Sequence, residues 1–189
     1  MTIIAPNAAL IVVDVQQGFS DPSWGTRNNP DFESNIAELL AGWHRTGRPI
    51  VLVRHHSTKT DSPLRPGQPG NDFQPLLENV TAELTLQKSV HSAFLGKPEL
   101  HAWLSAAGIG EIVVCGIQTN RCCETTARMG GDLGYRVLFA LDATHTFDEV
   151  GPDGSTVTAD EFARITAANL HHNFATVTTT ADIVSALKG

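Results

Sequence analysis

Apolar runs that alternate with helical patterns constrain the fold of this chain more than any other feature. The run 8–13 is apolar without a break, which is typical of a strand buried on both faces of a parallel sheet. Apolar residues then recur at helical spacing at Ile36, Leu39, Leu40 and Trp43. A second strand-like run, 49–53, follows that helix. This order predicts parallel strands joined by a crossover helix.

The same alternation continues along the chain and predicts six strands in all. We expect the further strands at Leu84–Lys88, 112–115, 136–141 and 175–178, and the further helices at 98–107, 122–133, 159–171 and 181–187. Residues 55–73 are rich in proline and glycine and are expected to form a loop. The predicted architecture is a three-layer α/β/α fold with a six-stranded parallel sheet. A chain of 189 residues suits one domain, residues 1–189.

Composition and charge exclude several classes of protein. The formal net charge is −7 and no basic patch is present, so neither nucleic acid nor a membrane is an expected partner. No apolar segment approaches the ~20 residues of a membrane span, and the N-terminal sequence lacks the basic start of a signal peptide. Three cysteines do not make a disulfide framework and fit a reducing compartment. We therefore expect a cytoplasmic protein that acts on a small-molecule substrate.

Polar residues follow three of the predicted strands. Asp14 ends the first strand, Lys88 ends the third, and a polar turn that leads to Cys122 follows the fourth. Ligands of such sheets bind at the carboxyl ends of the strands, where the strand order reverses. In the common order 3-2-1-4-5-6, strands 1 and 4 are neighbours, so Asp14 and Cys122 would meet there. The alternatives are a helix cap or a loop hydrogen bond for Asp14 and a solvated flank for Lys88.

Cys122 is placed where the next helix is expected to begin. A thiol at a helix N-terminus lies near the positive end of the helix dipole, which predicts a lowered pKa and a reactive thiolate. Free backbone N–H groups at the same place can hold an oxyanion. Adjacent helical residues differ by about 100° in direction, so Cys122 and Cys123 cannot both face a site. We expect Cys123 to pack against the sheet and Cys115 to be a buried core residue.

The eight histidines form no recognisable metal motif. None of them makes a His-x-x-x-His pair with a third ligand in register. His55, His56, His91 and His145 follow predicted strands and could touch a substrate, although we favour exposed loops for them as a group. No metal or cofactor is predicted.

Three motifs in order resemble the isochorismatase-like cysteine hydrolases, a family that includes nicotinamidases and N-carbamoylsarcosine amidase. Asp14-Val15-Gln16 with Phe19 resembles the family's Asp-x-Gln-x-x-Phe. Lys88 with Ser92-Ala93-Phe94 resembles its Lys-x-x-x-Ser-Ala-Phe. Gly116-Ile117-Gln118-Thr119-Asn120-x-Cys122 with Thr126-Ala127 resembles its nucleophile motif. The resemblance covers nearly the whole chain.

The resemblance implies a catalytic triad of Asp14, Lys88 and Cys122, with the sheet order 3-2-1-4-5-6. It also implies a cis peptide bond at Ile117–Gln118 and an oxyanion hole formed by the N–H groups of Gln118 and Cys122. Residues expected to contact the substrate are Gln16, Phe19, Trp24, His55 and Phe147. For Trp24, a lid or a subunit contact is an equal alternative. Self-association into a homo-oligomer is expected from the family.

Departures from the family pattern narrow the predicted function. Nicotinamidases of the family bind a metal through an Asp-x-His motif near strand 2, where this chain has Arg54 and no adjacent carboxylate. True isochorismatases lack the nucleophilic cysteine that Cys122 supplies. We therefore predict a metal-independent cysteine hydrolase that cleaves a small amide or related carbon–nitrogen bond through a thioester. The alternatives are a vinyl-ether hydrolase and an inactive redox or interaction domain on the same fold. Specificity is expected in loops 20–30, 55–73 and 144–158.

Overall fold

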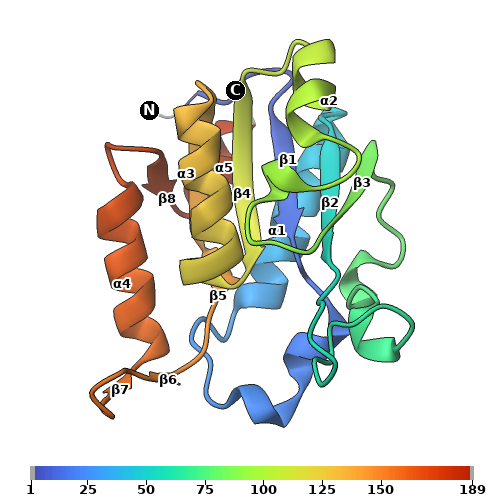
Figure 1. The fold of residues 1–189 in the computed structure, drawn as a ribbon. Coiled ribbons are helices and arrows are strands. Elements are labelled where there is room, and N and C mark those ends of the chain that lie inside the picture. The colour runs from blue at the N-terminus through green and yellow to red at the C-terminus, as the bar shows by residue number, and fades with distance from the viewer. Residues whose placement is uncertain (1–2, 188–189) are drawn as a thin grey trace.

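A six-stranded parallel sheet forms the centre of the computed structural model, which describes residues 3–187. The strand order is β3-β2-β1-β4-β5-β8, so β8 is the sixth strand of the predicted sheet and the predicted order is confirmed (Figure 1). The strands are β1 (Ala9–Val13), β2 (Ile50–His55), β3 (Leu84–Lys88), β4 (Glu111–Ile117), β5 (Arg136–His145) and β8 (Thr176–Thr178). Every neighbouring pair in this sheet is parallel.

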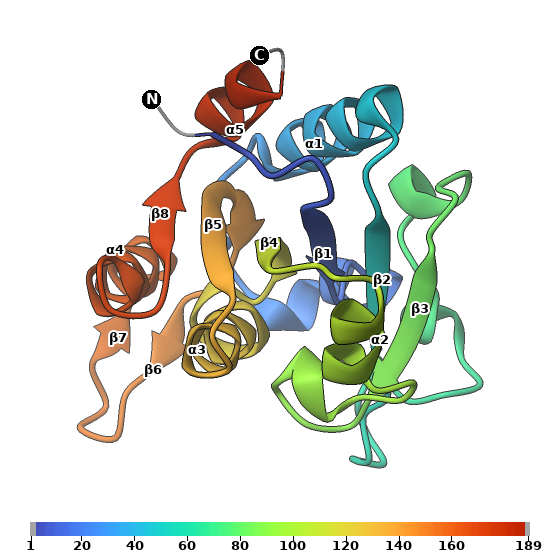
Figure 2. The same ribbon diagram turned by 90° about the horizontal axis from the view of Figure 1, so that it is seen from above.

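Helices cover both faces of the sheet, which gives the predicted three layers. Seen from above in Figure 2, α1 (Phe32–Thr46) and α5 (Thr180–Ala186) lie on one face. On the other face lie α2 (Leu100–Ala106), α3 (Glu124–Asp132) and α4 (Ala159–Leu170). The helix α4 begins with the predicted capping box, in which Thr158 and Glu161 bond reciprocally.

The first strand explains why its sequence is apolar without a break. Alternate side chains of a strand point to opposite faces. Leu10 and Val12 accordingly pack in the cluster that contains Trp43 of α1, whereas Ile11 and Val13 pack in the cluster on the α2 and α3 side. All of β1 is fully buried because a helix layer covers each face.

Several elements extend beyond their predicted ends. The strands β4 and β5 each continue past the predicted ranges, and their register shifts between Val114 and Gly116. A two-stranded hairpin, β6 (Glu149–Val150) with β7 (Thr156–Val157), was not predicted, since two residues per strand carry no periodic signal. Residues 119–123 form a wide helical turn of the π type that leads into α3. The helix α3 therefore begins at Glu124, two residues after the predicted start at Cys122.

Candidate active site

The ends of β1 and β4 meet closely at the point where the strand order reverses. Val13 is paired with Gly116, and a Cβ atom at position 116 would lie 2.0 Å from the Val13 carbonyl oxygen. Gly116 also has a φ of 123°, which side chains other than glycine rarely allow. The glycine therefore lets the Asp14 end of β1 approach the turn that carries Cys122.

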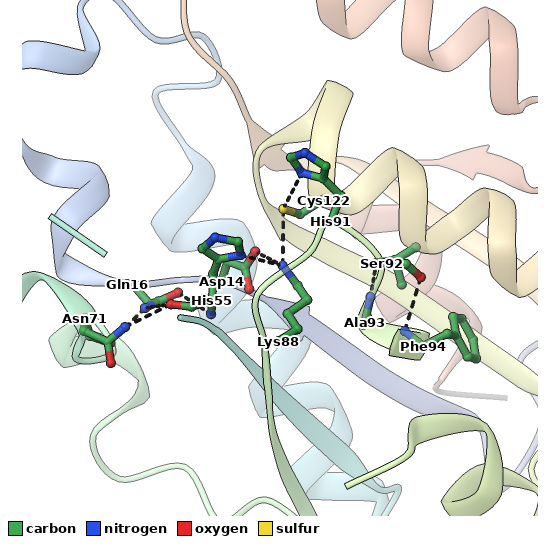
Figure 3. Close-up of polar contacts among 11 residues, drawn as sticks. Asp14, Gln16, His55, Asn71, Lys88, His91, Ser92, Ala93, Phe94 and Cys122 are labelled. Atoms are coloured by element: carbon green, nitrogen blue, oxygen red, sulfur yellow. Dashed lines mark hydrogen bonds and ion pairs between the residues drawn. The ribbon is translucent and has the colours of Figure 1, made fainter. Parts of the chain in front are cut away.

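The topology brings Asp14, Lys88 and Cys122 together, as Figure 3 shows. Lys88 Nζ lies 2.6 Å from Asp14 Oδ2, and both side chains are completely buried. The same ammonium donates to Cys122 Sγ at 3.3 Å. One cation at the end of β3 thus contacts a carboxylate at the end of β1 and a thiol in the turn after β4.

Burial and charge act in opposite directions on the ion pair. Burial raises the pKa of Asp14 above its usual value, although the Lys88 charge and hydrogen bond act to lower it. Burial acts to lower the pKa of Lys88, but the charges and hydrogen bonds of Asp14 and Cys122 together outweigh it, and the pKa of Lys88 is raised. Lys88 therefore stays protonated at neutral pH, and Asp14 is a stronger base than an exposed aspartate.

The predicted lowered pKa of the Cys122 thiol is wrong. Burial, with the negative charge of Asp14 next in importance, raises the pKa of Cys122 to about 12, and Lys88 offsets only part of this effect. The residue is 8% exposed and lies within the 119–123 turn rather than ahead of the helix. The resting sulfur is therefore a thiol, and a nearby base has to remove its proton before it can attack.

Two buried polar atoms at this site have no hydrogen-bond partner among the described residues. They are Asp14 Oδ1, an acceptor, and Gln118 Nε2, a donor. Asp14 also holds a left-handed backbone conformation with φ of 53°, which is uncommon for residues other than glycine and occurs often at functional sites. The peptide bond Ile117–Gln118 is cis. An unpaired acceptor and an unpaired donor beside a thiol can together match the N–H and C=O groups of an amide.

A cavity of about 270 Å³ opens over these residues. Its floor contains Asp14, Gln118 and Cys122, and the rest of its lining is Phe19, Trp24, His55, Ser57, Thr58, Lys59, Ser62, Leu64, Ser89, Val90, His91 and Arg121. The aromatic rings of Phe19 and Trp24 are 5.1 Å apart between centroids and form one wall. Phe19, Trp24 and His55, three of the expected contact residues, therefore face the space that a substrate would occupy.

Two other expected contact residues do not line the cavity. Gln16 is fully buried, and its side chain bonds to the backbone N–H and C=O of His55 and to the Asn71 carbonyl. Phe147 lies behind the aromatic wall, 5.4 Å from the Trp24 ring. Gln16 instead ties β2 to the following loop, and Phe147 supports Trp24, so direct substrate contact by these two residues stays a prediction.

The histidines near the site divide into three kinds. His91 Nδ1 lies 3.6 Å from Cys122 Sγ, a contact that the sequence analysis did not assign. His55 Nδ1 lies 3.3 Å from Lys88 Nζ, and burial, together with the Lys88 charge, lowers the pKa of His55 to about 4. His145 was expected in an exposed loop, but β5 extends to it and its ring is buried edge-on against Phe32.

The segment Ser92-Ala93-Phe94 after β3 holds the loop that carries His91. Ser92 Oγ accepts a hydrogen bond from Phe94 N at 3.2 Å, and Ala93 N donates to Thr126 Oγ1 of α3 at 3.0 Å (Figure 3). These bonds attach the loop to the helix that follows the Cys122 turn. The sequence does hold a clue to the role of His91, because this residue lies between Lys88 and the Ser92-Ala93-Phe94 segment of the same motif.

The other two cysteines are less accessible than Cys122. Cys115 and Cys123 are fully buried, and burial raises the pKa of each thiol above its usual value. All three cysteines are free of disulfides. Cys122 is the cysteine that lines the cavity.

A metal ion does not fit the donor atoms of this site. Asp14, His55 and Cys122 form a group whose possible ligand atoms lie within 4.8 Å of one another. Lys88 Nζ already lies within 3.3 Å of an atom of each of them. Near the end of β2, the sequence has Arg54 in place of a metal-binding carboxylate. The Arg54 guanidinium lies 4.3 Å from the centre of the Phe73 ring. The positive charge at the centre is therefore supplied by lysine.

No helix within residues 3–187 is both long enough and apolar enough to cross a membrane.

Comparison with known proteins gives a consistent result. The model of the isochorismatase domain matches residues 8–182. Nicotinamidase 3 of Arabidopsis thaliana is 32% identical, and the match covers 75% of each chain. An isochorismatase-family protein of Chromobacterium violaceum superposes with a TM-score of 0.93 at 39% identity, over 100% of this chain and 97% of the other. A cysteine hydrolase of Pseudomonas syringae pv. phaseolicola superposes with a TM-score of 0.88 at 26% identity, over 100% and 96% of the two chains.

Polar side chains at the switch point of a parallel α/β sheet lie where proteins of this class bind their ligands. The chain belongs to the isochorismatase family. Membership of this family supports the assignment of the protein as a hydrolase.

Proposed function

We propose that this protein is a metal-independent cysteine hydrolase that cleaves a small amide or a related carbon–nitrogen bond through a thioester. The observation that carries the proposal is the position of one buried ammonium, Lys88 Nζ, at 2.6 Å from Asp14 and 3.3 Å from Cys122 Sγ. A thiol with a raised pKa needs a base, and a carboxylate with a raised pKa is suited to that task.

The first half of the reaction forms the thioester. Asp14 takes the proton of the Cys122 thiol, and the sulfur forms a bond to the carbonyl carbon of the substrate. The oxygen becomes an oxyanion, which the N–H groups of Gln118 and Cys122 stabilise. Asp14 then gives its proton to the nitrogen, the carbon–nitrogen bond breaks, and the amine leaves.

The second half releases the acid. Asp14 takes a proton from a water molecule, and the oxygen of that water forms a bond to the thioester carbon. The carbon–sulfur bond then breaks, and the sulfur regains a proton from Asp14, which restores the resting state. Lys88 keeps its positive charge throughout, so it holds Asp14 in place and stabilises the sulfur whenever that atom is negative.

The names of two related proteins agree with this chemistry. Nicotinamidase 3 is named for cleavage of an amide, and the Pseudomonas syringae relative is named a cysteine hydrolase. The Asp14 and Gln118 atoms without partners offer an acceptor and a donor to such a group.

The test is a screen of small amides, carbamates and ureides for release of ammonia or amine. We expect Cys122→Ala to lower kcat by about 10⁴-fold or more for any substrate found, since the nucleophile is lost. Cys123→Ala is the matched control and is expected to keep most of the activity. Release of ammonia or amine that survives loss of Cys122 would refute the proposal. Hydrolysis of a vinyl ether that requires Asp14 but not Cys122, with no amide cleaved, would instead support the vinyl-ether alternative.

A further inference from the structure

The mouth of the active-site cavity has an uneven distribution of charge. The loop after β2 contributes Lys59, the loop after β3 contributes His91, and the 119–123 turn contributes Arg121. These three residues line the same cavity. The charges of Arg121 and Lys59 also act on His91: they add to the larger effects of burial and Lys88, which lower its pKa. Asp14 is the one acidic residue of the cavity lining among the described residues.

Most of the charges around the cavity are already neutralised by a partner. Asp14 pairs with Lys88 at 2.6 Å on the floor. Arg121 pairs with Glu149 of the β6–β7 hairpin at 2.6 Å. Lys59 makes no ion pair within residues 3–187, so the mouth of the cavity has one uncompensated positive charge.

This charge is an exception on an acidic protein. The chain as a whole carries a formal net charge of −7. The net charge repels an anion at a distance, whereas at this mouth the anion meets a local cation. Clefts with one sign of charge focus the field and favour ligands of the opposite sign.

Another part of the lining of the same cavity is apolar. Phe19, Trp24 and Leu64 line it, and the Phe19 and Trp24 rings are in contact. The cavity volume of about 270 Å³ is slightly below the usual range of about 300–1,000 Å³ for ligand sites, which suits a compact molecule. A ligand that fills this space meets the thiol on the floor, hydrocarbon or aromatic surface on one wall, and a cation at the mouth.

We infer that the substrate is a small amide that also bears a carboxylate, with the amide carbonyl at Cys122 and the carboxylate bound by Lys59. This inference rests on the proposed function and names its substrate class. An apolar segment between the two groups would lie against Phe19 and Trp24. Lys59 is then a specificity-determining residue that distinguishes acidic amides from neutral ones.

The test compares matched pairs of substrates. The monoamides of malonic, succinic, glutaric and adipic acid are each measured against the simple aliphatic amide of the same chain length, with release of ammonia as the readout. For the best pair, we expect wild-type kcat/KM to favour the acid by about ten-fold at low salt, and the preference to fall as salt screens the exposed Lys59 charge.

Variants of Lys59 assign the preference to this residue. Lys59→Met should lower kcat/KM for the acid about five-fold more than for the simple amide, mainly through KM. Lys59→Arg should restore most of the preference because it restores the charge. Lys97→Met, which removes an exposed lysine outside the cavity lining, is the matched control and should leave the preference unchanged.

The outcomes separate this inference from the function on which it rests. Cleavage of simple amides as fast as their acids, or an equal effect of Lys59→Met on both, would overturn the carboxylate assignment alone. Cleavage of neither series, or cleavage that survives Cys122→Ala, would overturn the amidohydrolase proposal and the substrate class with it.

Discussion

Lys88→Met would leave the buried Asp14 carboxylate without its ion-pair partner. The two side chains are both completely inaccessible, and their charged atoms lie 2.6 Å apart. Methionine keeps most of the volume of the lysine stem, so the change removes the charge with little loss of packing. The perturbation therefore measures how strongly the fold depends on this pair.

The expected cost is large because the remaining charge stays buried. Removing one partner of a buried pair typically lowers the free energy of unfolding by about 3–5 kcal/mol. In a chain of this size that corresponds to a fall in Tm of roughly 10 °C. Replacing both residues, as in Asp14→Asn with Lys88→Met, should cost less than the sum of the single changes, with a coupling energy of about 2 kcal/mol.

The cost should also depend on pH. Burial already raises the pKa of Asp14 in the folded protein, and without Lys88 nothing as strong opposes that effect. As pH falls through the raised folded pKa towards the unfolded value, the folded state binds more protons than the unfolded state and is stabilised. The destabilisation by Lys88→Met is therefore fully present above the raised pKa and decreases as the carboxyl becomes neutral.

The assay is urea unfolding followed by circular dichroism for wild type, both single variants and the double variant, at about pH 5 and about pH 8. Lys97→Met is the control, since it breaks an exposed pair with Glu99 and should have no measurable effect. A loss below about 1 kcal/mol for Lys88→Met, or additive single changes, would refute the buried-pair reasoning.

Two further predictions concern the thiol and the loop contacts. Because the pKa of Cys122 is raised to about 12, its alkylation by iodoacetamide should still accelerate above about pH 9, and peptide mapping should find it modified before Cys123; a plateau near the ordinary thiol pKa of about 8.5 would contradict this. Gln16→Leu removes three side-chain bonds to the backbone of His55 and Asn71, so urea unfolding should show a loss of about 2–4 kcal/mol. A loss below about 1 kcal/mol would mean that Gln16 does not hold the loop.

The sequence predicted the fold well where hydrophobic patterns are long. The unbroken apolar run at β1 predicted a buried parallel strand, and the apolar runs placed Asp14 and Lys88 at strand ends and Cys122 just after one. The common sheet order brought Asp14 and Cys122 together, and the family resemblance added Lys88 to them. Residues near strand ends could be brought together by topology alone, because carboxyl ends of parallel strands share one edge.

The details that were missed depend on tertiary contacts. Gln16 is polar and adjacent to the site, but its side chain is used entirely by backbone groups that are distant in sequence. His145 follows an apolar run of uncertain length, so its inclusion in β5 could not be foreseen. The direction of the Cys122 pKa shift depends on how deeply the turn is buried, which the local pattern of a helix start does not report.

The central claim is that Cys122 forms an acyl intermediate that Asp14 helps to hydrolyse. Asp14→Asn removes the base that deprotonates the Cys122 thiol, so the variant is assayed at about pH 9, where hydroxide in solution takes over that step. The change also removes a negative charge that, after burial, raises the pKa of Cys122, while Lys88 remains to stabilise a thiolate. An activated ester such as p-nitrophenyl acetate needs no proton for its leaving group, so this variant should still be acylated but should lack the base for deacylation.

Mass spectrometry of Asp14→Asn after exposure to p-nitrophenyl acetate tests this most directly. The account predicts one acetyl group per chain, located on the peptide that contains Cys122 and absent when Cys122→Ala is added. An acetyl group on Cys123, or no stable adduct while the wild type turns the ester over, would contradict it.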